Sequence, residues 1–347
     1  MNYSLALIGF GGVNRALVKI LTDKFFELKI GYDASFKVVA VSDINYGTAF
    51  DKDGLDLSKL ASMGKEKNVL TTLPNGDSGV DVYELIKLSN ANVVVEATFT
   101  DSVSGEPALS HCKAAINSNK HVVTTNKGPI ALHLDTLNSL ANEMGVTIGY
   151  EGTVMSGTPV INLTEKCLKG ATPMSFSGIL NGTANFILGE MESDKDMTSC
   201  IKQAQALGYA EADPTADIEG YDVMLKVTIL SKIIFGKTVN PKDIDRKGIT
   251  ELTSKHIKSA IAQKKKWKLL GQARLDETGK VIASVKPALI DENHSLYSIS
   301  GPQNALTITT DLLGETTVVG AGAGTTETAF ALLTDILNIG ETNECHA

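Results

Sequence analysis

Acidic side chains and one lysine gather in the second half of the sequence, where they can serve proton transfer. The carboxylates are Glu211, Asp213, Asp217, Glu219 and Asp222, and Lys226 follows them. Pro214 disfavours helix just before it, so a turn is predicted there, and a helix that becomes apolar is predicted from about residue 220. On that helix Asp222 and Lys226 share one face. A partly desolvated lysine can exchange a proton near neutral pH, and carboxylates beside it can hold a substrate ammonium group.

A purely structural interpretation of this segment stays open. Exposed Asp–Lys pairs at helical spacing are common and weak, so a solvated acidic turn before an ordinary helix fits the same residues. A calcium loop is disfavoured, because the acids do not alternate toward a final bidentate Glu and the central glycine is displaced.

The N-terminus has the order strand, glycine turn, helix that a dinucleotide site requires. An apolar run at 5–8 predicts a buried parallel strand, and apolar residues at helical spacing follow from 16. The turn between them consists of Gly9, Phe10, Gly11, Gly12, Val13 and Asn14. Gly9 permits the tight turn, and Gly11 lets a pyrophosphate approach the helix N-terminus. Asn14 occupies the third glycine position, where it can widen the helix–strand contact or place an amide near the phosphates. A plain strand-to-helix turn is the alternative.

Other polar residues follow the predicted strands of this first half. Asp43 ends a strand at 36–41, as does the acid that binds the ribose hydroxyls of NAD and repels the extra phosphate of NADP. Thr98 and Thr100 follow a strand at 93–97 and can face the cofactor. Asp43 also fits a capping or turn aspartate. Residues 29–35 are predicted to form an inserted loop, and 45–81 loops with a short helix.

Lys127 comes just after the strand predicted at 121–124, at the edge of a parallel sheet where ligands bind. A surface lysine in a turn explains that position equally well. A helix at 132–143 and a strand at 146–150 then complete a first domain, predicted as residues 1–150.

The segment after this domain bends sharply and contains one carboxylate. Glu151, Val154, Ser156 and Thr158 lie in it. Turned-in carbonyls with a carboxylate make an oxygen site suited to a monovalent or other hard cation. A simple domain-crossing loop is the alternative.

The rest of the chain predicts a second domain, 151–310, and a returning segment, 311–347. Thr183 lies at a helix start, where it can cap the helix or bind a substrate carboxylate. A lysine-rich helix at 255–268 precedes alternating strands at 269–275, 281–288 and 305–310, as in an antiparallel sheet. A glycine-rich run ending at Gly324 leads to a final helix at 327–336 and offers a second anion or cofactor contact. Close packing of that helix is the alternative.

Composition excludes several classes of protein. Hydrophobic residues make up 43% and charged residues 21%, as in soluble globular proteins, and the net charge of −8 argues against nucleic acid and anionic membranes as partners. The single basic cluster, at 264–266, is predicted to be a solvated helix face. Four scattered cysteines, Cys112, Cys167, Cys200 and Cys345, lack metal-ligand or redox spacing. With no signal peptide or membrane span in the sequence, a cytoplasmic protein is expected.

Taken together, these motifs resemble the homoserine dehydrogenases over nearly the whole chain. The match lies in the glycine turn, in 125–127, 151–154, 177–186 and 208–214, in Asp222 with Lys226, and in the glycine run 320–324. The resemblance implies an α/β protein: an N-terminal Rossmann-type parallel sheet, an α+β substrate and dimerisation domain with a mixed sheet, and a C-terminal helix returning to the Rossmann domain. It implies a homodimer. Because no regulatory extension follows in this sequence, feedback inhibition through one is not expected.

The resemblance also implies roles for single residues. Lys226 is expected to exchange the hydroxyl proton of L-homoserine while a hydride passes to NAD or NADP, with Lys127 as its partner near substrate and nicotinamide. Substrate ligands implied are Glu211, Asp222 and Thr183, and Gly324 is a late cofactor contact. Glu151 with the backbone of Val154, Ser156 and Thr158 matches the family's Na⁺ site. Asn14 in the glycine turn, and Gly152 and Ser156 in the segment of the cation site, depart from the family's pattern.

Three other functions remain open on the sequence. Aspartate-semialdehyde dehydrogenase needs a nucleophilic cysteine beside a histidine, and His111 does precede Cys112, although neighbours on a helix point apart. A Rossmann oxidoreductase of sugars and a non-catalytic NAD(P)-binding sensor are the others. The choice between NAD and NADP and the size of the oligomer stay open.

Overall fold

The chain folds into two compact units. The structure is a computed structural model that describes residues 1–77 and 79–344, with side chains described to residue 340. Unit 1 comprises residues 1–157 with the segment from 324 onward, and unit 2 comprises residues 158–323. Cys345 lies outside the described residues. No described helix combines the length and apolarity needed to cross a bilayer.

Unit 1 is built on a mainly parallel sheet of order β4-β3-β2-β1-β5-β6-β7. The strands β2, β1, β5, β6 and β7 run parallel, and β3 and β4 pair antiparallel at one edge. Their bounds are β1 Asn2–Ile8, β2 Ser35–Asp43, β3 Gly47–Phe50, β4 Gly76–Asp77, β5 Val93–Glu96, β6 His121–Thr124 and β7 Ile148–Gly149. The parallel strands confirm the prediction, whereas β3 and β4 lie in a region predicted to be loops and one short helix.

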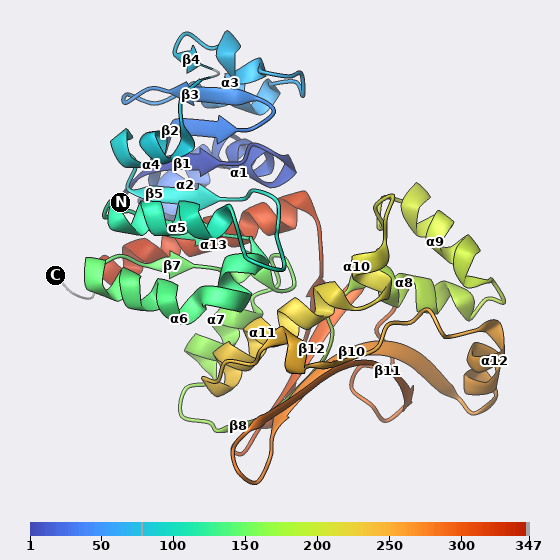
Figure 1. The fold of residues 1–347 in the computed structure, drawn as a ribbon. Helices are drawn as coiled ribbons and strands as arrows, with labels where there is room; N and C mark the ends of the chain where they lie inside the picture. Colours follow the sequence, from blue (N-terminus) through green and yellow to red (C-terminus); the bar gives the residue numbers. More distant parts are fainter. Residues whose placement is uncertain (78, 345–347) are drawn as a thin grey trace. The chain divides into compact units, whose positions relative to one another are not determined.

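Helices cover both faces of this sheet (Figure 1). The helices are α1 Gly12–Asp23, α2 Phe25–Tyr32, α3 Leu57–Ser62, α4 Val82–Leu88, α5 Ala108–Asn117, α6 Lys127–Met144 and α13 Thr325–Glu344, with single turns η1 Val69–Thr72 and η2 Glu151–Thr153. α4, α5 and α6 lie on one face, and α1 and α13 pack together on the other. α13 buries Leu332 and Ile336 in the same core as Leu5 and Leu17. This packing confirms the predicted return of the C-terminal helix to the nucleotide-binding fold.

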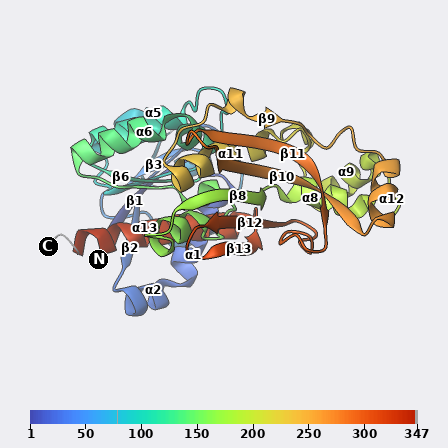
Figure 2. The same ribbon diagram turned by 90° about the horizontal axis from the view of Figure 1, so that it is seen from below.

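Unit 2 contains a mixed sheet of order β13-β12-β8-β10-β11-β9. Its neighbours pair antiparallel except β11 with β9. The strands are β8 Pro173–Ile179, β9 Asp245–Arg246, β10 Lys265–Leu275, β11 Val281–Asp291, β12 Gln303–Thr310 and β13 Gly314–Ala321. The helices are α7 Val160–Asn162, η3 Leu163–Cys167, α8 Gly182–Met191, α9 Met197–Ala206, α10 Thr215–Ile218, α11 Tyr221–Phe235, η4 Pro241–Asp243 and α12 Ser254–Ala262. α11 lies against β10 and β11 (Figure 2).

Two local predictions are wrong. The lysine run at 264–266 is not a helix face: α12 ends at Ala262, Lys264 adopts φ +55°, and Lys265 begins β10. Lys268 to Gly271 are buried in succession, and Lys268 donates to Asn185 and to the Ile299 carbonyl. These tertiary contacts outweigh the helix propensity of lysine. Residues 29–35 are not a simple loop either, since α2 extends to Tyr32.

Candidate active site

The glycine turn of unit 1 provides open backbone donors at a helix N-terminus. Gly9 has φ +81°, and a Cβ added there would lie 2.7 Å from the carbonyl oxygen of Ala97, so only glycine fits. Gly11 is the N-cap of α1, without a side-chain cap among the described residues and with empty space around its would-be Cβ. The first N–H groups of α1 therefore remain available to an anion. This arrangement fits the pyrophosphate of a dinucleotide.

Asn14 and Arg15 reinforce this turn from inside. Asn14 is fully buried and donates from Nδ2 to the Gly9 oxygen at 2.6 Å, so its amide braces the turn and does not face outward to phosphates. Arg15 donates from Nε to the Phe10 oxygen at 2.8 Å, and its guanidinium stacks on the rings of Phe10 and Tyr46 at 4.4 and 4.7 Å. Arg15, one of only three arginines in the chain, was not predicted as a site residue.

Asp43 ends β2 and faces the glycine turn. Its Oδ2 accepts from the Phe10 N–H at 2.7 Å, and its Oδ1 accepts from the Asn45 N–H at 2.8 Å. The residue is thus a turn aspartate, and at the same time it places a negative charge beside the turn. At the neighbouring strand end, Thr98 donates its hydroxyl to the buried Glu96, and Thr100 is exposed.

Lys127 is the first residue of α6, directly beyond β6. Its neighbour Asn126 caps the helix by accepting from the Gly128 N–H at 3.2 Å and donates from Nδ2 to the Phe99 oxygen at 2.8 Å. The turn that bears Thr98 and Thr100 is therefore joined to the start of α6. Lys127 lies at the carboxyl edge of the sheet, where ligands of such folds bind.

Gly324 begins the segment that returns to unit 1. It has φ +133°, and its carbonyl accepts from the Thr328 N–H at 2.9 Å in the first turn of α13. A Cβ on Gly12 would lie 2.8 Å from Thr325, so α13 begins beside the glycine turn of α1. The nucleotide-turn residues and Gly324 are thus brought close together within unit 1.

The candidate cation loop is buried and sharply bent. Glu151, Val154 and Ser156 are buried, and Met155 and Ser156 adopt φ near +57° and +55°. The Glu151 N–H donates to Oδ2 of Asp335 at 2.9 Å, a second buried carboxylate that the sequence analysis did not identify. Oxygen donors of this kind suit a hard monovalent cation. The described residues contain no cluster of three or more His, Cys, Asp or Glu for a transition metal.

Two hydroxyl groups of this loop have partners elsewhere. Ser156 shares a hydrogen bond of 2.8 Å with Thr328 of α13. Thr158 belongs to unit 2, where its hydroxyl donates to the Ala321 oxygen at 3.0 Å.

Unit 2 holds the predicted lysine in a buried ion pair. α11 begins after Gly220, which has φ +79°, and becomes apolar after its first turn, as predicted. Lys226 is 6% exposed; its Nζ lies 2.8 Å from Oδ2 of Asp222 and donates to the Leu180 oxygen at 2.6 Å. The amine is therefore fixed in position beside the carboxylate of Asp222.

Asn181 and Asp217 extend this cluster. Asn181 caps α8 through Oδ1, which accepts from the Ala184 N–H at 2.8 Å. Its Nδ2 donates to Asp217 at 2.6 Å and to Asp222 at 3.0 Å. Burial raises the pKa of Asp217, Asn181 opposes the rise by its hydrogen bond, and the charge of Asp222 adds to it. The sequence placed Asp217 among the carboxylates that can hold a substrate ammonium group, but it did not predict the contact of Asn181 with Asp217 and Asp222.

Thr183 and Glu211 occupy different environments. Thr183 is buried in the first turn of α8 and donates to the Tyr209 oxygen at 2.6 Å. Glu211 is exposed, and its backbone carbonyl accepts from Gln205 at 3.0 Å. The structure thus joins Lys226, Asp222, Asn181 and Asp217 by direct contacts, and Glu211 is not part of that set of contacts.

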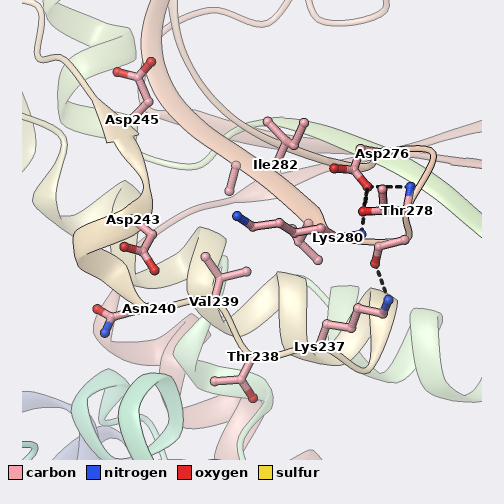
Figure 3. A pocket seen from close by; sticks show the side chains of 13 residues that line it. Lys237, Thr238, Val239, Asn240, Asp243, Asp245, Asp276, Thr278, Lys280 and Ile282 are labelled. Carbon is pink, nitrogen blue, oxygen red and sulfur yellow. Dashed lines mark hydrogen bonds between the residues drawn. The ribbon is translucent and has the colours of Figure 1, made fainter.

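A groove of about 650 Å³ in unit 2 lies apart from these residues. Lys237 donates to the Gly279 carbonyl there, and Asp276 accepts from Thr278 in the turn between β10 and β11 (Figure 3). None of the predicted site residues lines it. We interpret it as a surface groove beside a hairpin.

The structure argues against an aspartate-semialdehyde dehydrogenase in which Cys112 is the nucleophile. Cys112 is buried in α5, and burial followed by the charge of Glu96 raises the pKa of its thiol well above the ordinary value. A nucleophilic cysteine needs the opposite shift. His111 lies 3.5 Å from Glu96 through Nδ1.

Comparison with known proteins identifies both halves of the chain. Residues 159–337 match the homoserine dehydrogenase family, and residues 9–151 match the homoserine dehydrogenase NAD-binding domain. The NAD(+)-dependent homoserine dehydrogenase of Pseudomonas canavaninivorans is 47% identical over 97% of this chain and 96% of that protein. The homoserine dehydrogenase of Methanocaldococcus jannaschii is 38% identical over 96% and 98%.

Solved structures of homoserine dehydrogenases are also similar to this chain. A putative homoserine dehydrogenase from Archaeoglobus fulgidus superposes with a TM-score of 0.86 at 31% identity, covering 97% of this chain and 99% of that one. A hyperthermophilic archaeal homoserine dehydrogenase mutant in complex with NADPH gives 0.82 at 30% identity, covering 99% and 98%. With the nucleotide turn, the buried lysine and these matches over nearly its whole length, the chain belongs to the homoserine dehydrogenase family, whose members are NAD(P)-dependent oxidoreductases.

Proposed function

We propose that this homoserine dehydrogenase oxidises L-homoserine to L-aspartate 4-semialdehyde reversibly, with Lys226 as the group that exchanges the hydroxyl proton. The reaction converts L-homoserine and NAD⁺ into the semialdehyde, NADH and one proton. The observation that supports this role most directly is the buried Nζ of Lys226, held at 2.8 Å from Asp222 and bonded to the Leu180 carbonyl. A fixed amine beside one carboxylate is suited to proton transfer at a defined point.

Each unit contributes its own residues to the proposed reaction. When bound, the nicotinamide cofactor accepts the hydride from the carbinol carbon. Lys226 in its neutral form takes the hydroxyl proton, directly or through water, and its ammonium returns the proton in the reverse direction. Asp222, Glu211 and Thr183 are proposed to orient the amino acid. Lys127, in unit 1, is proposed to act near substrate and nicotinamide.

We also propose that NAD is preferred to NADP. Asp43 ends β2 with its carboxylate against the glycine turn, and a carboxylate there attracts ribose hydroxyls and repels a 2′-phosphate. The relative from P. canavaninivorans is named as NAD(+)-dependent, whereas one structural neighbour was solved with NADPH. Initial rates are measured with homoserine and each cofactor separately, from the absorbance of the reduced nicotinamide. They decide between NAD and NADP. A higher kcat/KM with NADP would contradict the proposal.

Replacing Lys226 tests the central role. We expect Lys226→Ala to lower turnover by roughly a hundredfold or more, because general acid–base catalysis contributes that much. Lys232→Ala is the matched control, since Lys232 lies in the last turn of the same helix and donates to the Gly236 carbonyl. Circular dichroism of both variants monitors folding. Near-normal turnover of folded Lys226→Ala would refute the assignment.

The homodimer and the cytoplasmic location stay predictions of the sequence.

A further inference from the structure

A fully buried carboxylate lies at the centre of the cofactor-side turns and has no role in the function proposed above. Glu96 is the last residue of β5, at the carboxyl edge of the unit 1 sheet, and is 0% exposed. A buried carboxylate is costly unless hydrogen-bond donors surround it. The hydrogen-bond donors around Glu96 therefore stabilise its carboxylate and fix its position.

The donors to Glu96 come from both turns that follow β5 and β6. Oε1 accepts from the N–H of Thr98 at 3.2 Å and from its hydroxyl, and Oε2 accepts from the Thr124 hydroxyl at 3.2 Å. Nδ1 of His111, on α5, lies 3.5 Å from Oε1. One side chain thus connects the turn containing Thr98 with the end of β6.

The connection continues from Thr124 to the start of α6. The Thr124 oxygen accepts from the Asn126 N–H at 3.0 Å, and Asn126 in turn accepts from the Gly128 N–H at 3.2 Å and donates to the Phe99 carbonyl. Lys127 lies between Asn126 and Gly128. Both of its chain neighbours therefore belong to a network that ends on Glu96.

The carboxylate of Glu96 sets the direction of the hydroxyl hydrogen bond from Thr124. A carboxylate only accepts, so the Thr124 hydroxyl must donate to it and keeps its lone pairs for the Asn126 N–H. A glutamine at this position has the same shape, but its NH2 group carries two donors. These donors would compete with the Asn126 N–H for the lone pairs of the Thr124 hydroxyl. We propose that Glu96 is a positioning residue, which fixes the start of α6 and so the place of Lys127 in the reaction; this proposal rests on the function proposed for Lys127.

The same two strands provide a matched control at their other ends. Lys120 is buried just before β6, and its Nζ donates to the carbonyls of Ser89 and Ala91, which precede β5. Glu96 and Lys120 therefore both use a buried charge to connect β5 with β6. Only Glu96 does so at the edge where Lys127 lies.

The test compares Glu96→Gln with Lys120→Met in the full-length protein. We expect Glu96→Gln to lower kcat by about tenfold or more, since small displacements of a catalytic group cost this much, while NADH affinity measured by fluorescence titration changes by less than about threefold. Lys120→Met should lower the melting temperature and leave kcat within about twofold. Equal effects of the two variants on kcat at equal loss of stability would overturn the proposal.

Combination with Lys127→Ala separates this inference from the proposed role of Lys127. If Glu96 acts through Lys127, Glu96→Gln should change kcat by less than about twofold in the Lys127→Ala background. A full additional loss there would show that Glu96 acts by another route and overturn the proposal. Normal turnover of Lys127→Ala alone would instead refute the role of Lys127, and the positioning role with it.

A second pair of variants keeps the test valid if Glu96→Gln does not fold. Thr124→Val keeps the side-chain shape and removes the hydroxyl between Glu96 and Asn126, so it should lower kcat like Glu96→Gln. Thr124→Ser keeps the hydroxyl and should restore most of the turnover. Equal turnover of the valine and serine variants would contradict the proposed network.

Discussion

At the scale of single residues, Asp43 combines a structural role in the glycine turn with a negative charge that one substitution removes. Its carboxylate holds the Phe10 N–H and also places a negative charge beside the glycine turn. Asp43→Asn removes the charge and keeps one of the two acceptor oxygens, so either the Phe10 N–H or the Asn45 N–H loses its acceptor. We expect the ratio of kcat/KM for NAD to that for NADP to fall by about tenfold, the size of one screened charge–charge repulsion. Steady-state kinetics with both cofactors measure it.

Asp33→Asn serves as the control for that substitution. Asp33 pairs with Lys29 on the surface after α2, away from the glycine turn. It should leave the cofactor ratio unchanged. An Asp43→Asn enzyme with the parental ratio would contradict the proposed role of the charge.

Lys268 makes the stability of the protein change with pH in the alkaline range. It is buried in β10, donates to Asn185 at 2.9 Å, and burial lowers its pKa from 10.5 to about 8. At pH values between these two pKa values, Lys268 is protonated in the unfolded chain and largely neutral in the folded one. The unfolded chain therefore binds more protons, and the contribution of Lys268 to stability rises with pH. Below about pH 8 the folded protein bears the full cost of burying the charged lysine.

Lys268→Met should remove this rise. We expect the free energy of unfolding of the unsubstituted protein, relative to the variant, to increase by on the order of 2 kcal/mol from about pH 7 to about pH 10. Urea unfolding at the two pH values measures it. Lys255→Met, at an exposed lysine of α12, controls for general lysine titration. A pH-independent difference between protein and variant would be the contrary result.

Single residues differ in how far the sequence reveals them. Asp222 and Lys226 could be paired from sequence, because four positions in one helix fix their proximity. Asn181 reaches Asp217 and Asp222 across 36 and 41 residues, and no local rule predicts that contact. Glu96 was hidden because it ends an apolar strand, and its partners come from three other segments.

At the scale of elements, the two ends of α11 offer a matched comparison. Gly220 precedes the helix with φ +79°, and Gly236 follows it with φ +67°. A Cβ on Gly220 would lie 2.9 Å from Val285 in β11, whereas one on Gly236 meets nothing within 4 Å. Both substitutions to alanine strain the backbone, but only the first also presses the start of the helix against the sheet.

We therefore expect different outcomes for the two alanine variants. Gly236→Ala should cost about 1 kcal/mol of unfolding free energy, and Gly220→Ala about 2–3 kcal/mol. Only Gly220→Ala should also lower turnover, since it displaces the helix start that holds Asp222 and Lys226. Denaturant unfolding and initial rates test both points. Equal losses in the two variants would argue against a steric role for Val285.

The strands of unit 2 show where local patterns fail. Residues 269–275 alternate clearly, and their strand was predicted; Lys265 to Lys268 precede them and were assigned to a helix by their lysine content. In β10 the burial of Lys268 depends on Asn185 and on the Ile299 carbonyl, which lie far away in the sequence. Lysine content alone therefore gave the wrong element, because tertiary partners decide the conformation there.

At the scale of the whole molecule, each unit has its own core. Leu5, Leu17 and Leu332 share one in unit 1, and Ile179, Leu270 and Leu296 share another in unit 2. The order of elements along the sequence predicted the parallel sheet of unit 1, and the resemblance to the homoserine dehydrogenases implied the mixed sheet of unit 2. The strand β8, however, lies between β10 and β12, which follow it by roughly a hundred residues, and that pairing depends on long-range packing.

The chain passes from unit 1 to unit 2 at the loop that begins with Glu151. In unit 1 this loop is attached to the returning helix α13 twice, by the Glu151 N–H to Asp335 and by Ser156 to Thr328. We propose that a monovalent cation, Na⁺ or K⁺, binds here through Glu151 and the carbonyl oxygens of the bent backbone. Buried carboxylates and turned carbonyls are the donors that such ions take.

Removing the ions tests this proposal on the whole enzyme. Exchange of Na⁺ and K⁺ for tetramethylammonium at constant ionic strength should lower turnover and the melting temperature, because the bulky cation cannot enter a buried site, and added Na⁺ should restore both. Glu151→Gln should raise the Na⁺ concentration for half-maximal recovery by about tenfold, as expected for losing one charged ligand. Glu143→Gln, exposed at the end of α6, is the control. Full turnover without either ion would mean that the loop only connects the two units.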